Sequence, residues 1–217
     1  MTENALRDRQ TERLIFFSDA AFAFALMLLV AEVRLPANIP EGEFWGELAR
    51  IAPQFSAFLI SFALGSLWWL VHVSATRDLR VFDWPTAVCN LIFLAFIVLL
   101  PFSAATFGQN ILSNEALGLY WIVNAGASFA MTLMFFVMSR GGGRLIGGLT
   151  GGERALRLFQ SIAPGLVFVL GAYWAFTDQV WLSRFCAMFL APLMMGAGVI
   201  EARMRRKRVS AEAPPAP

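Results

Sequence analysis

Six apolar segments alternate with short polar connections along the 217 residues, and this pattern constrains the fold more than any other feature of the sequence. Most of these segments reach the ~20 residues that a helix needs to cross a bilayer. Hydrophobic residues make up 58% of the chain and charged residues 15%, whereas soluble domains carry about 25% charged residues. The sequence therefore predicts an all-α integral membrane protein.

The predicted membrane domain covers residues 13–201. A polar stretch, 1–12, precedes it, and a tail that is first basic and then rich in Ala and Pro, 202–217, follows it. The expected transmembrane helices are 13–35, 44–73, 85–107, 115–138, 154–176 and 180–200. The first of them contains no glycine, so it cannot supply the Gly-rich filter loop of voltage-gated-type potassium channels.

The distribution of Lys and Arg predicts the orientation of these helices. With six crossings and both termini cytoplasmic, 14 of the 17 basic residues lie inside, and only Arg34, Arg50 and Arg184 lie outside. Positively charged loops stay in the cytoplasm. We therefore expect a multi-pass protein of the plasma (inner) membrane, in contact with lipid.

The sequence offers little for an enzyme or a metal site. Cys89 and Cys186 lie inside apolar segments, where they predict neither a disulfide nor metal ligands. His72 is the single histidine and has no second His or Cys nearby. No Ser-His-Asp, Cys-His or paired-carboxylate arrangement appears. We predict no enzymatic activity, no cofactor, no metal and no nucleic-acid partner.

The first apolar segment differs from the others because charges flank it closely. Its uninterrupted apolar run, Ala20 to Ala31, is only twelve residues long. On a helical wheel at 100° per residue, one face is formed by Arg13, Phe17, Ala20, Ala21, Phe24, Met27, Leu28, Ala31 and Leu35. Charged segments are best placed inside a bundle or along water, which suggests that this face lines a pathway. Ordinary packing through small residues also explains the same face, and periodicity alone favours this second interpretation.

The motif Arg13-x-x-x-Phe17-Ser18-Asp19 resembles the hallmark of the endolysosomal potassium channel family (transmembrane protein 175) in its bacterial six-helix form. The ending Glu32-Val-Arg-Leu-Pro36, Trp69 with His72, the region of Arg77 and Asp83, and Leu100-Pro-Phe-Ser103 also match. This resemblance covers residues 13 to about 108. The later half of the chain agrees with the family only in its number of helices.

The resemblance implies a homotetramer in which four copies of the first helix surround a pore. Carried over by position, the pore constriction would consist of Phe24, Leu28, Met27 and Ala31. The supporting polar network would consist of Arg13, Phe17, Ser18, Asp19, Trp69 and His72. Phe24 stands where the family usually has Ile or Leu, Met27 where Thr is common, and Ala20 where Gly is common.

Charges are expected at both mouths of such a pore. Acidic residues after the first helix would concentrate cations at the outer mouth, chiefly Glu32, Glu41 and Glu43. At the inner mouth Arg13 would oppose cations unless a carboxylate neutralises it. Asp19 of an adjacent subunit, Asp78 and Asp83 are the candidate carboxylates.

The sequence therefore predicts a passive, potassium-permeable cation channel with an apolar constriction, in which the potassium ion is the permeant species. Two alternatives stay open. One is a proton-coupled or other secondary transporter that titrates Asp19, His72 and Glu32, although no inverted repeat supports it. The other is a non-conducting membrane scaffold in which Phe24 blocks the axis.

Overall fold

The computed structural model describes residues 3–77, 79, 83–140 and 151–186, and these are helical apart from short connections. The helices are α1 (Glu3–Ala31), α2 (Phe44–Arg50), α3 (Ala52–Thr76), α4 (Trp84–Gln109), α5 (Asn114–Met138), α6 (Gly151–Phe176) and α7 (Val180–Cys186). Five are long and apolar enough to cross a membrane: the part of α1 from Arg9, α3, α4, α5 and α6 from Arg154. The described part of the chain is thus an all-helical bundle with five candidate spans.

The predicted sixth span, 180–200, begins as α7, and its remainder lies outside the described residues. The Gly-rich loop of residues 141–150 and the tail of residues 202–217 also lie outside them.

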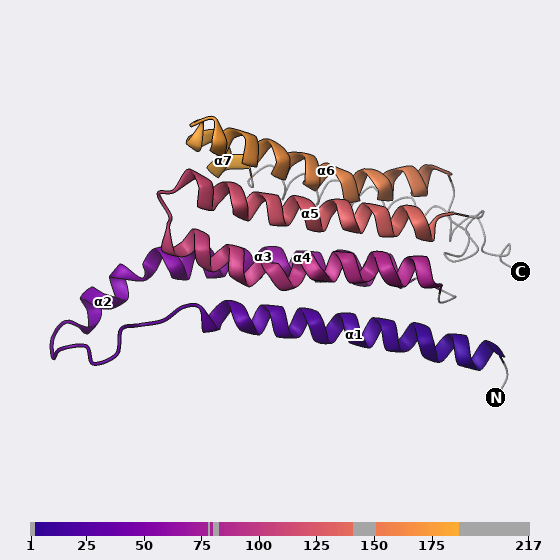
Figure 1. The fold of residues 1–217 in the computed structure, drawn as a ribbon, viewed down its shortest axis with the longest axis horizontal. Coiled ribbons are helices and arrows are strands. Elements are labelled where there is room, and N and C mark those ends of the chain that lie inside the picture. Colours follow the sequence, from indigo (N-terminus) through magenta and orange to yellow (C-terminus); the bar gives the residue numbers. More distant parts are fainter. Residues whose placement is uncertain (1–2, 78, 80–82, 141–150, 187–217) are drawn as a thin grey trace, which may run out of the picture.

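The long helices lie roughly antiparallel (Figure 1). From the middle of the bundle, α4 contacts α3 and α5, and α5 contacts α6. Helix α1 packs along one flank, against α3 and α4. It is the least covered span, because only 22% of its most apolar stretch is buried, compared with 67% for α5. A long apolar surface of α1 is therefore left free for lipid or for protein.

Two helices begin at side-chain caps that the local sequence supplies. The side chain of Asp83 accepts a hydrogen bond from the backbone N–H of Thr86 at the start of α4, where Pro85 occupies the first turn. Ser113 does the same for Ala116 at the start of α5. Such caps satisfy backbone donors that have no partner within the helix.

The bounds of the first two predicted helices, 13–35 and 44–73, differ from those in the structure. Helix α1 starts at Glu3 and ends at Ala31, whereas residues 13–35 were predicted. Arg34 Nε donates to the carbonyl oxygen of Ala31 at 2.9 Å, and this bond satisfies one of the open carbonyls at the helix end. The predicted continuous helix of residues 44–73 is divided at Ile51 into α2 and α3, because Pro53 follows in the first turn of α3.

A close approach of α1, α3 and α4 depends on Gly65. A Cβ atom added there would lie 2.7 Å from Leu26 Cδ2 of α1 and 3.3 Å from Leu100 Cδ2 of α4. We expect Gly65→Val to destabilise the fold by about 1–3 kcal/mol through overpacking. Thermal unfolding of the purified protein in detergent measures this. Gly46→Val is the matched control, because a Cβ at Gly46 meets nothing within 4 Å. An equal loss in that variant would contradict the prediction.

Candidate functional site

One face of α1 is buried against α3 and α4. Ser18, Phe22, Ala25 and Leu29 are each at most 2% exposed. Their spacing of four, three and four residues places them in one stripe along the helix. The rest of the circumference of α1 therefore has little contact within a single subunit.

The opposite face carries the residues that the sequence predicted to line a pore. Phe24 is 54% exposed, Met27 is 59% exposed, and Arg13, Phe17 and Ala31 are also exposed. Leu28 is half-buried, since it turns toward α4. A single subunit leaves this apolar face without a protein partner among the described residues, as a helix at a symmetry axis requires.

A buried series of hydrogen bonds joins the middle of α1 to the bundle. Ser18 Oγ donates to the carbonyl oxygen of Leu14 at 2.8 Å and accepts from Asn90 Nδ2 at 2.9 Å. Asn90 Oδ1 lies 2.8 Å from His72 Nε2. Because the Ser18 hydroxyl proton is used on Leu14, the amide of Asn90 must donate to Ser18, so its oxygen must accept from the His72 Nε2–H group. Three helices, α1, α3 and α4, are thus joined by one continuous series of hydrogen bonds.

Aromatic rings enclose the His72 side chain. The Phe93 ring stacks on the imidazole with the centroids 5.6 Å apart, and the Phe22 ring lies 5.7 Å away at a tilt. His72 is 1% exposed, and its Nδ1 atom has no hydrogen-bond partner among the described residues. The lone histidine is therefore held by packing and by one hydrogen bond as a structural group.

A second tie joins Asp19 to α3. Trp69 Nε1 donates to Asp19 Oδ1 at 3.0 Å, near the surface of the bundle. The predicted network is thus only partly assembled within one subunit. Asp19 is bonded to Trp69, and Ser18 is connected to His72 through Asn90, while the Phe17 side chain is exposed. Asn90 was not assigned to this network from the sequence. A polar amide amid the apolar residues of α4 was the available signal.

The carboxylates proposed for Arg13 do not pair with it in the described part of one subunit. Asp19 accepts from Trp69, and Asp83 caps α4. Asp78 lies outside the described residues. The neutralisation of Arg13 stays a prediction, with Asp19 of an adjacent subunit still a candidate.

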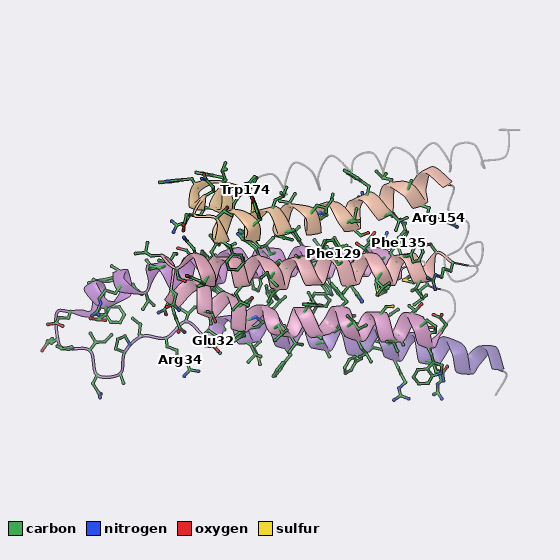
Figure 2. All side chains as sticks on the ribbon, turned by 45° about the horizontal axis from the view of Figure 1, so that its top comes forward. Glu32, Arg34, Phe129, Phe135, Arg154 and Trp174 are labelled. Carbon is green, nitrogen blue, oxygen red and sulfur yellow. The ribbon has the colours of Figure 1, made fainter. Side chains whose placement is uncertain are left out.

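The predicted acidic residues gather at the end of α1 that is opposite to its N-terminus. Figure 2 shows Glu32 and Arg34 at this end and Arg154 at the other. Glu32 and Leu28 form one wall of a cavity of about 380 Å³, which Phe102, Thr106 and Gln109 of α4 help to line. Glu41 and Glu43 are exposed in the connection before α2. Carboxylates are therefore accessible to solvent where a conduit along α1 would open.

Comparison with known proteins links this helix to a family. Residues 13–101 match the sequence model of the family described as endosomal/lysosomal potassium channel TMEM175. The resemblance to the transmembrane protein 175 family is confirmed. The match contains α1 from the motif onward, Trp69, His72 and Asn90. The buried hydrogen bonds from Ser18 to His72 therefore lie entirely within the part that resembles the family.

Similar proteins carry potassium channel names. A potassium channel of Streptomyces collinus is 23% identical over 137 residues, which cover 61% of this chain and 66% of the relative. One of Chryseobacterium is 26% identical and one of Chamaesiphon minutus is 29% identical, with 59% and 58% of this chain covered. The matched stretch spans just under two thirds of the length of these relatives, between 63% and 66%.

Solved structures share the fold. A structure described as a lysosomal potassium-selective channel TMEM175 homolog from Chamaesiphon minutus aligns with a TM-score of 0.72 at 20% identity, covering 89% of this chain and 98% of that one. A potassium channel MtTMEM175 variant aligns with a TM-score of 0.59 at 20% identity, covering 88% and 93%. The helical arrangement of the TMEM175 homologues is therefore also that of this chain.

Proposed function

We propose that this protein is a passive, potassium-permeable cation channel, built as a homotetramer with α1 around the axis. The exposed apolar face of α1, with Phe24 54% exposed opposite a buried polar anchor, is the observation that carries the proposal. The names of the relatives support potassium as the permeant ion. Phe24, Leu28, Met27 and Ala31 form the constriction, and no cofactor takes part.

The site has the parts that passive conduction needs. Apolar rings pass ions when the constriction is wide enough to stay wet and block them when it dewets. The Glu32, Glu41 and Glu43 carboxylates raise the local cation concentration at the outer mouth. The bonds from Asn90 and Trp69 hold α1 at a fixed angle, so that its free face points in one direction. Weak discrimination among monovalent cations is expected from such a constriction.

The proposed orientation has both termini in the cytoplasm and six crossings of the plasma membrane. It is supported by the arginines next to the helix ends: Arg77 follows α3, Arg140 follows α5 and Arg154 lies in the first turn of α6, whereas Arg34 and Arg50 flank the connection between α1 and α3. Figure 2 shows Arg154 and Arg34 at opposite ends of the bundle. Six crossings include the predicted span of residues 180–200, of which α7 is the described start.

The rival function, a coupled transporter, needs titrating groups that exchange protons with water. The burial of His72 behind Phe22 and Phe93 disfavours it for that role, whereas Asp19 and Glu32 are partly accessible. The channel is therefore preferred, and Asp19 is the residue on which the two functions differ.

Potassium flux from liposomes tests the proposal. We expect wild-type protein to dissipate a potassium gradient without any ion counter-gradient, and Asp19→Asn to retain most of this flux. The asparagine keeps an oxygen that accepts from Trp69 Nε1, so the helix tie is preserved while the titrating proton is lost. Flux that requires a proton gradient and disappears in Asp19→Asn would identify a carrier instead. No flux in either protein, with both correctly inserted, would favour the scaffold.

The subunit number needs a separate measurement. The mass of the detergent-solubilised protein, after correction for bound detergent, is expected to correspond to four copies of the 24.0 kDa chain. A monomer in mild detergent and in lipid nanodiscs would remove the central axis and with it the pore.

A further inference from the structure

The short helix α2 has features that neither the pore nor the polar anchor explains. It lies immediately before α3 and leaves the bundle beyond the end of that helix (Figure 1). None of its residues is buried. Trp45 is 76% exposed, Phe44 is 47% exposed and Leu48 is 37% exposed. Three of the seven residues of this helix are thus large apolar side chains, and the rest of the described chain does not bury them.

These side chains form one face. At 100° per residue, Phe44, Trp45 and Leu48 lie within an arc of about 100°, and Glu47, Gly46 and Arg50 lie within an arc of similar width on the other side. Glu47 Oε1 and Arg50 Nη1 form an ion pair on this polar side. The helix is therefore amphipathic, with its polar groups paired away from the apolar face.

The position of α2 along the bundle identifies what covers the apolar face. The candidate span Ala52–Thr76 begins two residues after Arg50, so α2 lies at the boundary between the bilayer and water. Trp side chains are enriched at this boundary because an amphipathic ring suits the headgroup region. Amphipathic helices lie there with the apolar face in the upper acyl chains.

The size and charge of α2 disfavour a protein partner and anionic lipid. A stable protein interface needs about 800 Å² on each partner, which three side chains of one short helix do not provide by themselves. Residues 41–51 hold Glu41, Glu43 and Glu47 against the single Arg50, a net charge of −2 (three minus one). An acidic segment is not drawn to anionic lipid or to an identical segment of another copy.

We propose that α2 is an interfacial anchor that inserts Phe44, Trp45 and Leu48 among the headgroups and upper acyl chains of neutral lipid. In this position it fixes the depth of the outer end of α3. The proposal depends on the membrane-spanning fold and not on conduction or on the number of subunits, so it can fail or succeed independently of the proposed function.

The test uses full-length protein in vesicles of zwitterionic lipid, with a nitroxide label at one of two positions. Leu48→Cys places the label on the apolar face, and Gly46→Cys places it about 160° away on the polar face, where a new side chain meets nothing within 4 Å. The native Cys89 and Cys186 are buried, and unsubstituted protein taken through the same labelling measures their background. Oxygen, which concentrates in the bilayer, and a water-soluble nickel chelate are the two relaxing agents.

We expect the label at position 48 to be relaxed several-fold more by oxygen than by the nickel chelate, and the label at position 46 to show the reverse. Adding Trp45→Ala to the position 48 variant should lower its oxygen-to-nickel ratio several-fold. Anionic lipid and high ionic strength should leave the ratio unchanged, since burial of apolar surface and not charge attraction provides the binding. Nickel access at position 48 equal to that at position 46 would overturn the proposal, as would shielding from both agents with spin–spin broadening, which would place another copy on the face.

Discussion

The substitution Phe24→Ala is expected to raise potassium flux from liposomes about tenfold or more. Phe24 is the bulkiest side chain at the predicted constriction and is 54% exposed in one subunit, where it contacts the axis in the proposed tetramer. Four phenyl rings at one level narrow the conduit and favour its dewetting. Their removal needs to lower the barrier by only about 1.4 kcal/mol to raise the rate tenfold.

Phe16→Ala is the matched control for this experiment. Phe16 is on the same helix and is 71% exposed, but it lies outside the predicted pore face, about 80° from Phe24 on the helical wheel. We expect its flux to equal that of the unsubstituted protein. An unchanged flux in Phe24→Ala would contradict the assigned constriction. An equal rise in both variants would indicate a leak caused by a damaged fold.

The substitution Asn90→Ala is expected to destabilise the protein by about 2–4 kcal/mol, the largest stability effect that we predict. Asn90 is 1% exposed and is the only described link between Ser18 and His72. Its loss leaves the Ser18 hydroxyl and the His72 Nε2–H group buried with one partner fewer, and each such group costs about 1–3 kcal/mol. For a chain of this length, the melting temperature in detergent should fall by about 5–10 °C.

Two further variants test whether the loss of stability comes from the Ser18–Asn90 bond and not from the removal of an amide in general. Asn110→Ala removes an exposed amide whose bond goes to the carbonyl oxygen of Thr106, and it should change the melting temperature little. Adding Ser18→Ala to Asn90→Ala should cost less than the sum of the two single changes, because both members of one bond are then removed. Additive losses would show that the Ser18–Asn90 bond does not stabilise the fold.

Much of the architecture follows from local chemistry and could be read from the sequence. The apolar segments and the cap residues before α4 and α5 act over a few residues. Helices α4 and α5 begin at Trp84 and Asn114, each one residue before the expected start. The motif around Ser18 and Asp19 identified the resemblance that comparison with the family then confirmed. The break at Ile51 was missed, although Pro53 two residues later was the signal for a new helix start.

The sequence by itself determined that this is a helical membrane protein whose first half resembles the transmembrane protein 175 family, because hydropathy and a short motif are properties of neighbouring residues. Only the tertiary structure decided which face of α1 packs against the bundle and which residues bond to it. Asn90 is 72 residues from Ser18 and 18 from His72, so no periodicity within one helix brings the three together. Their meeting depends on how α1 packs against α3 and α4, and the same packing leaves Phe24 and Met27 uncovered in a single subunit.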